Sequence, residues 1–360
     1  MNTNSVLPAA LPFRKRKNEM AYRDFPFQLK SCVWEITLAC CFRCAYCGSR
    51  GGKARENELT TAECLDVARQ LADMGCRRAS VIGGEVFMRP DWAEIVGALT
   101  SRGVKACIIT NGFRMTPSII SELKRLNVES VAVSIDGVRE IHDAYRQKGS
   151  YDRAIETLRV LAAAQLPVSV IPSLRADNAP LLPSLYQELR TLPLFAWQIQ
   201  ACSPMGNAGD NGLSVAFNAR DVIRFVAETA PSAPFAVGVA DNIGYYTPEE
   251  GTIRGVPGAY FEGCSAGLTT IGIDSVGNVR GCESMYDARF IEGNLRERSL
   301  ADIWTDPEAF AYNRRFTPEM LTGACEKCPQ GVICAGGCRS YNYFTTGRLY
   351  ENCLCARINE

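Results

Sequence analysis

Four cysteines stand close together near the N-terminus, at Cys40, Cys41, Cys44 and Cys47. Counted from Cys41 the spacing is CxxCxxC, and counted from Cys40 it is CxxxCxxC. Either set of three thiolates suits an iron–sulfur cluster. A ferredoxin-type run would continue to a fourth cysteine, but Cys47 is followed by GSRGG. A four-iron cluster held here would keep one iron open, which predicts a reactive site rather than an electron carrier.

A second group of cysteines lies in the last hundred residues. Cys325, Cys328, Cys334 and Cys338 form the pattern CxxCxxxxxCxxxC, and Cys264, Cys282, Cys353 and Cys355 lie on either side of it. The chain has 17 cysteines and a single histidine, His142. No secretory signal is evident, so thiolate metal ligation in a reducing cytoplasm accounts better for these clusters than disulfides do.

Composition excludes several other functions. Lys and Arg total 39, as do Asp and Glu, so the formal net charge is zero and no basic field predicts a nucleic-acid partner. No apolar run reaches the roughly 18 residues of a membrane span. The basic stretch RKRK at residues 14–17 lacks the apolar segment of a signal peptide and reads as a solvated tail.

The elements that position the cysteines alternate between strand and helix patterns. Strands are predicted at 32–38, 78–84, 105–112, 130–137, 168–174 and 195–200, and helices at 60–75, 90–103, 117–127, 151–164 and 219–230. Six such units predict an α/β fold with a parallel sheet curved into a partial (β/α)6 barrel of the TIM type. Active sites of such folds lie at the carboxyl ends of the strands, which is where the first cysteine group stands.

Glycine and proline become more frequent after about residue 240, and helical periodicity fades. We therefore predict an irregular segment at 1–30, a barrel at 31–240 and a small cysteine-rich domain at 241–360.

The first half of the chain resembles the radical S-adenosylmethionine (SAM) superfamily, whose motif is CxxxCxxC with an aromatic residue before the last cysteine. This resemblance favours Cys40, Cys44 and Cys47 over the register that uses Cys41. The segments GGE at 83–85, TNG at 110–112, VSIDGVREIHDAYR at 133–146 and ACSPMGNAG at 201–209 match in order. The resemblance implies that the residues in contact with SAM are Tyr46, Gly83, Gly84, Glu85, Asn111, Ser134, Asp136 and Arg146. In it, Glu85 binds the ammonium group of SAM.

The C-terminal part resembles the SPASM domain, which carries auxiliary iron–sulfur clusters. The resemblance implies one cluster at Cys264, Cys282 and Cys338, called auxiliary I below. It implies a second at Cys325, Cys328, Cys334 and Cys355, called auxiliary II, with Cys353 as the reserve ligand. Thr270 stands where some members have a cysteine, so auxiliary I would have an open iron or borrow a ligand. Three [4Fe–4S] clusters are expected in all.

The function that the resemblance implies is reductive cleavage of SAM to a 5′-deoxyadenosyl radical, which abstracts hydrogen from a substrate. The substrate expected is a ribosomally made peptide that is cross-linked, epimerised or dehydrogenated. The alternatives are a small-molecule radical dehydrogenase, a sulfatase-maturating enzyme and a plain electron carrier. Cys202 is a candidate hydrogen-atom donor and Glu283 a candidate base.

The partners expected are the peptide or protein substrate and an electron donor such as a flavodoxin or ferredoxin. No peptide-recognition domain of the usual size precedes the first strand, so recognition of a leader peptide would need either a separate leader-recognition protein or the barrel itself.

Overall fold

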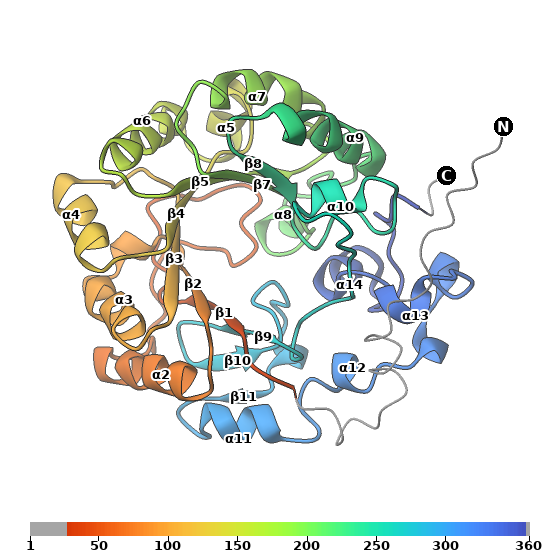
Figure 1. Cartoon of the computed structure of the whole chain (residues 1–360). Coiled ribbons are helices and arrows are strands. Elements are labelled where there is room, and N and C mark those ends of the chain that lie inside the picture. Colours follow the sequence, from red (N-terminus) through yellow and green to blue (C-terminus); the bar gives the residue numbers. More distant parts are fainter. Residues whose placement is uncertain (1–26, 358–360) are drawn as a thin grey trace.

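A curved parallel sheet forms the centre of the molecule, and helices line its outer side (Figure 1). The computed structural model describes residues 27–357, and the predicted irregular segment lies outside them up to residue 26. Six strands follow in chain order across the sheet: β1 (Ser31–Glu35), β2 (Arg78–Ile82), β3 (Lys105–Thr110), β4 (Ser130–Ser134), β5 (Val168–Ile171) and β7 (Ala196–Ala201). The two end strands of the sheet do not pair with each other, so the barrel is partial, as predicted.

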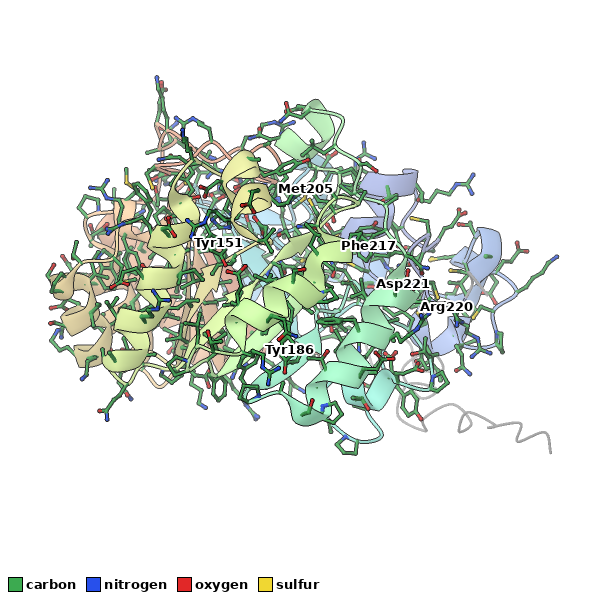
Figure 2. All side chains as sticks on the ribbon, turned by 90° about the horizontal axis from the view of Figure 1, so that it is seen from above. Tyr151, Tyr186, Met205, Phe217, Arg220 and Asp221 are labelled. Carbon is green, nitrogen blue, oxygen red and sulfur yellow. The ribbon has the colours of Figure 1, made fainter. Side chains whose placement is uncertain are left out.

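The helices that cover the sheet connect successive strands. They are α2 (Thr61–Asp73), α3 (Trp92–Thr100), α4 (Pro117–Arg125), α5 (Arg139–Tyr145), α6 (Ser150–Ala163), α7 (Leu182–Leu189) and α9 (Ala219–Thr229). Figure 2 shows Tyr186 of α7, and Arg220 and Asp221 of α9, in this outer layer. Tyr186 stacks on Trp197 of β7 with ring centroids 6.3 Å apart, which fixes α7 against the sheet.

The first helix begins where its sequence predicts. Thr60 is the N-cap: its hydroxyl accepts from the Glu63 backbone N–H, and the Glu63 carboxylate accepts from Thr60 N. This capping box satisfies two backbone donors that a helix start otherwise leaves open. The capping box therefore fixes the point at which the long cysteine-bearing loop ends and α2 begins.

The sheet continues past β1 into the C-terminal part of the chain. Strand β9 (Thr270–Ile273) pairs in parallel with β1, with Ser31 opposite Thr270, and antiparallel β10 (Asn278–Arg280) and β11 (Gly293–Asn294) extend it further. A single apolar core runs through both parts and includes Trp34 of β1. The predicted boundary near residue 240 is therefore crossed by backbone hydrogen bonds, because β9 completes the edge of the barrel.

Several short elements are absent from the sequence prediction. They include α5, α7, the two-residue β6 (Ser173–Leu174), β8 (Ala236–Val239) beside β7, and all three strands of the C-terminal part. The remaining helices span one or two turns: α8 (Asn207–Asp210), α10 (Glu250–Ile253), α11 (Leu300–Thr305), α12 (Ala311–Arg314), α13 (Gly331–Cys334) and α14 (Arg339–Thr346). Elements this short carry too little periodicity to be recognised from sequence. Among the helices of residues 27–357, none has the length and hydropathy that crossing a bilayer requires.

Candidate functional site

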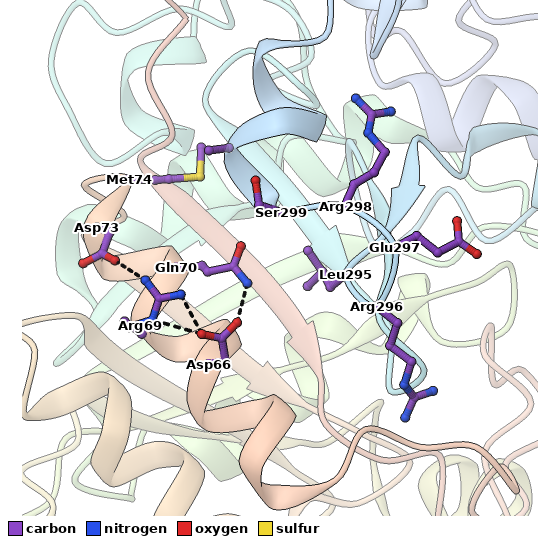
Figure 3. Close-up of a pocket in the computed structure, with 11 residues that line it drawn as sticks. Asp66, Arg69, Gln70, Asp73, Met74, Leu295, Arg296, Glu297, Arg298 and Ser299 are labelled. Carbon is purple, nitrogen blue, oxygen red and sulfur yellow. Dashed lines mark hydrogen bonds and ion pairs between the residues drawn. The ribbon is translucent and has the colours of Figure 1, made fainter.

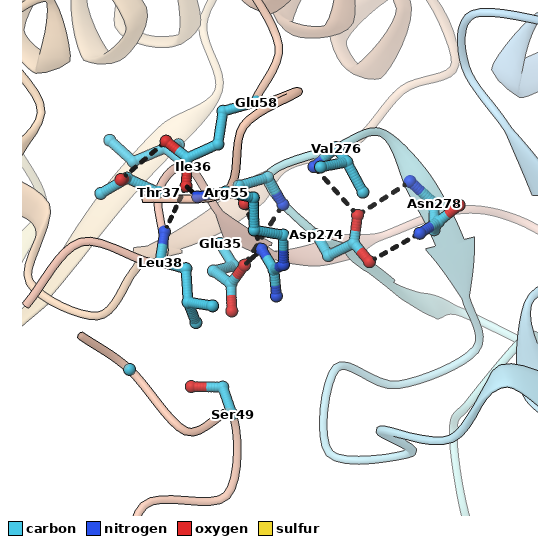
Figure 4. Close-up of polar contacts among 12 residues, drawn as sticks. Glu35, Ile36, Thr37, Leu38, Ser49, Arg55, Glu58, Asp274, Val276 and Asn278 are labelled. Carbon is cyan, nitrogen blue, oxygen red and sulfur yellow. Dashed lines mark hydrogen bonds and ion pairs between the residues drawn. The ribbon is translucent and has the colours of Figure 1, made fainter. Parts of the chain in front are cut away.

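The N-terminal cysteines lie on a loop that leaves the carboxyl end of β1 and folds back on itself. Cys40 N donates to Gly52 O at 2.9 Å, and Gly52 N donates to Leu38 O at 2.8 Å. These two hydrogen bonds hold the two ends of the loop together. Glu58 anchors the same base, because its carboxylate accepts from the Thr37 hydroxyl at 2.8 Å and from Leu38 N at 2.6 Å (Figure 4).

Within the loop, Cys40 and Cys47 converge on Gly51. A β-carbon at Gly51 would lie 3.5 Å from Cβ of Cys40 and 3.7 Å from Sγ of Cys47. Backbone amides already point at both sulfur atoms: Phe42 N lies 3.4 Å from Cys40 Sγ, and Gly51 N lies 3.2 Å from Cys47 Sγ. Such N–H donors are typical of cluster thiolates. The arrangement fits the register that uses Cys40, which stays a prediction.

The GGE segment packs directly on the cysteine loop. A β-carbon at Gly84 would stand 2.4 Å from Leu38 O and 2.5 Å from Ala39 O, so only glycine allows this approach. Gly84 N and Glu85 N donate to the carbonyls of Thr37 and Ala39, each at 2.7 Å. Gly83 is similarly close, with its β-carbon position 2.8 Å from Thr37 O.

The Glu85 carboxylate is buried and turned toward the end of β3. It accepts from the Thr110 hydroxyl at 2.7 Å and from Asn111 N at 2.8 Å. Burial raises the pKa of Glu85 to about 7, even though these donors work in the opposite direction. Asn111 in turn places its amide nitrogen 3.4 Å from Cys41 Sγ and 4.0 Å from Cys40 Sγ. Glu85 therefore ties the GGE and TNG segments together beside the cysteines.

Three predicted SAM residues form one buried ionic group. Arg146 Nε lies 2.6 Å from Asp136 Oδ2, and the Tyr46 hydroxyl donates to the same carboxylate. Burial raises the pKa of Asp136, but the charge and hydrogen bonds of Arg146 outweigh it and hold the pKa at about 2. Arg146 also lies over the Tyr46 ring, 5.5 Å from its centroid. Ser134 ends β4 two residues before this group.

The loop after β7 closes over the cysteine loop from the other side. Asn207 N donates to Cys47 O and Asn207 Nδ2 donates to Cys44 O, both at 2.9 Å. Asn211 Nδ2 donates to Ala45 O at 2.7 Å. The sequence indicated this segment only as a motif, and its role as a clamp on the cluster loop was missed.

A cavity of about 280 Å³ lies between the cysteine loop and the C-terminal part. Tyr46, Gly48 and Met205 line it on one side, and Cys282 and Cys338 line it on the other. Cys202, at the end of β7, also lines this cavity and is buried. Burial raises the pKa of the Cys202 thiol to about 12, so it carries its proton at neutral pH.

The auxiliary I cysteines are half-buried, and two of them, Cys282 and Cys338, line this cavity. Burial raises the pKa of Cys282 to about 12, with the neighbouring Cys264 thiol acting in the same direction. Burial also raises the pKa of Cys338, and the neighbouring Cys264 thiol acts in the same direction. Thr270 does not join them through its hydroxyl, because that hydroxyl lies 2.8 Å from the hydroxyl of Ser31 on β1.

The auxiliary II cysteines line one small cavity. Cys325, Cys328, Cys334 and Cys355 all contribute to its wall, whereas Cys353 is exposed at the surface. This arrangement supports Cys355 over Cys353 as the fourth ligand. No set of His, Cys, Asp or Glu side chains within residues 27–357 forms a site for a single metal ion.

A buried amide shows that this cavity fits a cluster. Asn352 lines it, and its backbone N–H lies 3.5 Å from Cys325 Sγ. The side-chain oxygen Oδ1 of Asn352 accepts a hydrogen bond from Leu354 N at 2.8 Å. The orientation of the amide is thereby fixed, with its nitrogen Nδ2 on the opposite side. Within the described residues Nδ2 has no hydrogen-bond partner although it is buried. A cluster sulfur atom would supply the missing acceptor.

Glu283 is directed away from the central cavity, although its neighbours Cys282 and Ser284 line it. Its two carboxylate oxygens are buried, and neither has a hydrogen-bond partner in the part of the chain described. Burial, reinforced by the charge of Glu35, raises the pKa of Glu283 well above its ordinary range. Glu35, which pairs with Arg55 (Figure 4), was missed as a functional candidate, although an acid in the apolar strand CVWEITL is a visible signal.

A further groove, of about 430 Å³, lies between α2 and the segment before α11 (Figure 3). Arg69 there donates to Asp66 and Asp73, so these three charges are paired within α2, whereas Glu63 of the same helix pairs with Arg296. None of the cysteines lines this groove, which places it apart from the cluster chemistry.

Comparison with known proteins agrees with this geometry. The model of the radical SAM superfamily matches residues 34–184, and that of an iron–sulfur cluster-binding domain, SPASM, matches residues 264–329. The mycofactocin maturase MftC of Mycobacterium tuberculosis is 30% identical over 324 residues, which cover 87% of this chain and 79% of the relative. An AdoMet-dependent heme synthase of Methanosarcina barkeri is 27% identical over 332 residues, covering 89% of this chain and 93% of the relative.

Among solved structures, Streptococcus suis SuiB bound to its precursor peptide SuiA shares the fold, with a TM-score of 0.74 and 17% identity. The match covers 98% of this chain and 82% of SuiB. The chain belongs to the radical SAM superfamily and carries a C-terminal SPASM domain. It is therefore an enzyme that uses SAM, a radical SAM [4Fe–4S] cluster and auxiliary clusters, and these predictions are confirmed.

Proposed function

We propose that this enzyme modifies a ribosomally synthesised peptide by radical chemistry. The observation that carries the proposal is the cavity that joins the cysteine loop to Cys282 and Cys338. A substrate bound there touches the SAM side and the auxiliary I side at once. Two of the similar proteins are consistent with a peptide, since one is named a maturase and the other is a structure with a precursor peptide.

The chemistry of the cavity wall favours a peptide over a carboxylated tetrapyrrole. Its polar lining consists of hydroxyl, thiol and amide groups such as Ser173, Gln200 and Asn242. Within the described residues its one charged lining group is Asp241, an acid. Neutral donors and acceptors suit peptide backbone, whereas a ligand with several carboxylates needs cations that this wall lacks.

The proposed SAM contacts divide between two sides of the cysteine loop. On one side, Gly83 and Gly84 bring the backbone close to that loop, and Glu85 and Asn111 place their polar side chains beside it. Tyr46, Ser134, Asp136 and Arg146 form the opposite wall, where the guanidinium can meet the SAM carboxylate. When bound at Cys40, Cys44 and Cys47, the cluster supplies the electron that cleaves SAM to a 5′-deoxyadenosyl radical.

Cys202 is proposed as the hydrogen-atom donor of an epimerisation. Its protonated thiol is the form that can donate a hydrogen atom, and it lines the proposed substrate cavity. The radical abstracts hydrogen from a peptide α-carbon, and Cys202 returns hydrogen to the opposite face. The thiyl left on Cys202 regains one electron, from a flavodoxin or ferredoxin donor, and one proton. Glu283 is kept as the proposed base, although its carboxylate is directed away from this cavity and burial raises its pKa.

The test is anaerobic incubation of reconstituted enzyme with SAM, a reductant and a candidate precursor peptide, sought among short reading frames beside its gene, in deuterated water. We expect 5′-deoxyadenosine together with a modified peptide that has gained solvent deuterium for epimerisation or lost two hydrogens for a cross-link or dehydrogenation. Where the peptide alone is inert, a separately encoded leader-recognition protein is added. Turnover of a porphyrin substrate with no change to the peptide would refute the proposal in favour of a small-molecule enzyme.

A further inference from the structure

Arg339 is a buried cation that has no anionic partner among the described residues. It is the first residue of α14, and its side chain is fully buried. No carboxylate pairs with it within residues 27–357, and its Nε and Nη2 atoms have no hydrogen-bond partner there. Burying an unpaired charge costs several kcal/mol, so a guanidinium in this position requires an explanation.

One edge of the guanidinium is held by the protein. Nη1 donates to the carbonyl of Ala335 and to that of Leu349 at 3.2 Å. Ala335, Gly336 and Gly337 all have positive φ, of 54°, 77° and 81°, and this left-handed turn brings the Ala335 carbonyl to the guanidinium. The group also lies over the Tyr350 ring, 4.5 Å from its centroid. The opposite edge, with Nε and Nη2, is left for another acceptor.

The auxiliary II cysteines are close by. The left-handed turn directly follows Cys334, and Gly336 within it lines the same cavity as the four cysteines. Cys325 packs in one apolar cluster with Tyr350, the ring that supports the guanidinium.

We propose that Arg339 is the counter-charge of the auxiliary II cluster and raises its reduction potential. A four-iron cluster with four thiolates is an anion, and reduction makes it more negative. A fixed cation beside it therefore stabilises the reduced form more than the oxidised form. Arg339 acts as a positioned charge rather than as a ligand. The inference rests on the proposed assignment of Cys325, Cys328, Cys334 and Cys355.

The test is a redox titration of the fully reconstituted enzyme, followed by electron paramagnetic resonance. The Cys355→Ser variant first identifies the auxiliary II signal as the one that disappears. In Arg339→Gln, which keeps donors for the carbonyls but removes the charge, we expect that signal to titrate at a more negative potential. In Arg339→Lys, which keeps the charge, we expect a potential closer to that of the wild type.

A matched control is Arg314, which is also buried over aromatic rings and donates to the carbonyls of Gly267 and Trp304, neither of which lines the auxiliary II cavity. Arg314→Gln should leave the auxiliary II potential unchanged. An unchanged potential in Arg339→Gln, or an equal shift in Arg314→Gln, would overturn the proposal. Loss of the cluster in Arg339→Gln but not in Arg339→Lys would support it, whereas loss in both would assign a structural role. A signal that survives Cys355→Ser would overturn the ligand assignment, and this inference with it.

Discussion

Gly206 packs directly against the carbonyl oxygen of Gly48, where the loop after β7 meets the cysteine loop. A β-carbon at Gly206 would stand 2.2 Å from Gly48 O and 2.5 Å from Cys47 O, and both atoms belong to rigid backbone. The cysteine loop is therefore held by a contact that only glycine permits.

We expect Gly206→Ala to displace the two loops from each other and to lower the iron bound after reconstitution. Gly212→Ala is the control: its φ of 59° is also left-handed, but no atom of residues 27–357 lies within 4 Å of its β-carbon position. That variant should lose about 1 kcal/mol of stability and keep its iron. Iron analysis and urea unfolding measure both effects, and equal iron loss in the two variants would count against the contact.

Removal of Arg146 should break the buried ionic group. Arg146→Met leaves the Asp136 carboxylate buried without its cation, which should cost roughly 3–5 kcal/mol in unfolding free energy and abolish SAM binding. Arg139→Met, at the first residue of α5, whose C-cap is Arg146, removes a half-exposed pair with Asp152 and should change little. Urea unfolding and equilibrium SAM binding test this prediction. Similar losses in both variants would show that helix α5, not the buried pair, is responsible.

The two adjacent cysteines distinguish the two registers. We expect Cys40→Ser to abolish SAM cleavage and Cys41→Ser to retain most of it, because Cys40 and Cys47 face each other across Gly51. Yield of 5′-deoxyadenosine and iron content are measured on both variants. The reverse pattern would establish the CxxCxxC register instead.

Iron content tests the number of clusters. Three four-iron cubes predict about twelve irons per chain after anaerobic reconstitution. Cys355→Ser should lose about four of them, while Cys353→Ser, which alters an exposed thiol, should lose none. A wild-type value near four would mean that the C-terminal cysteines bind something other than iron–sulfur clusters.

The buried Glu85 predicts a pH effect on the stability of the apoprotein. Its folded pKa of about 7 lies above the ordinary value of 4.5, so the unfolded chain releases this proton first as pH rises. Between those pH values the folded state therefore loses stability, by at most about 3 kcal/mol at 1.36 kcal/mol per pKa unit. Glu85→Gln should gain stability over wild type at pH 8 and lose that advantage near pH 4. Urea midpoints that run parallel across this range would contradict the prediction.

The sequence by itself determined the chemistry and the barrel. The predicted ligands Cys40, Cys44 and Cys47 are neighbours along the chain, so their spacing indicates their geometry, and the long helices and strands carry clear periodicity. The radical SAM class, the partial barrel and the need for SAM and several clusters could all be predicted in this way. The SAM contacts and the individual cluster ligands stay predictions that the structure supports.

Only the tertiary structure decided which distant segments meet. Strand β9 pairs with β1 although about 240 residues separate Ser31 from its partner Thr270. That pairing brings Cys282 to the same cavity as Cys202, and the fold turns Cys355 inward while Cys353 faces solvent. These relationships come from long-range packing and burial, which local spacing does not encode. The isolated charge of Arg339 likewise becomes visible only once every neighbouring group is in place.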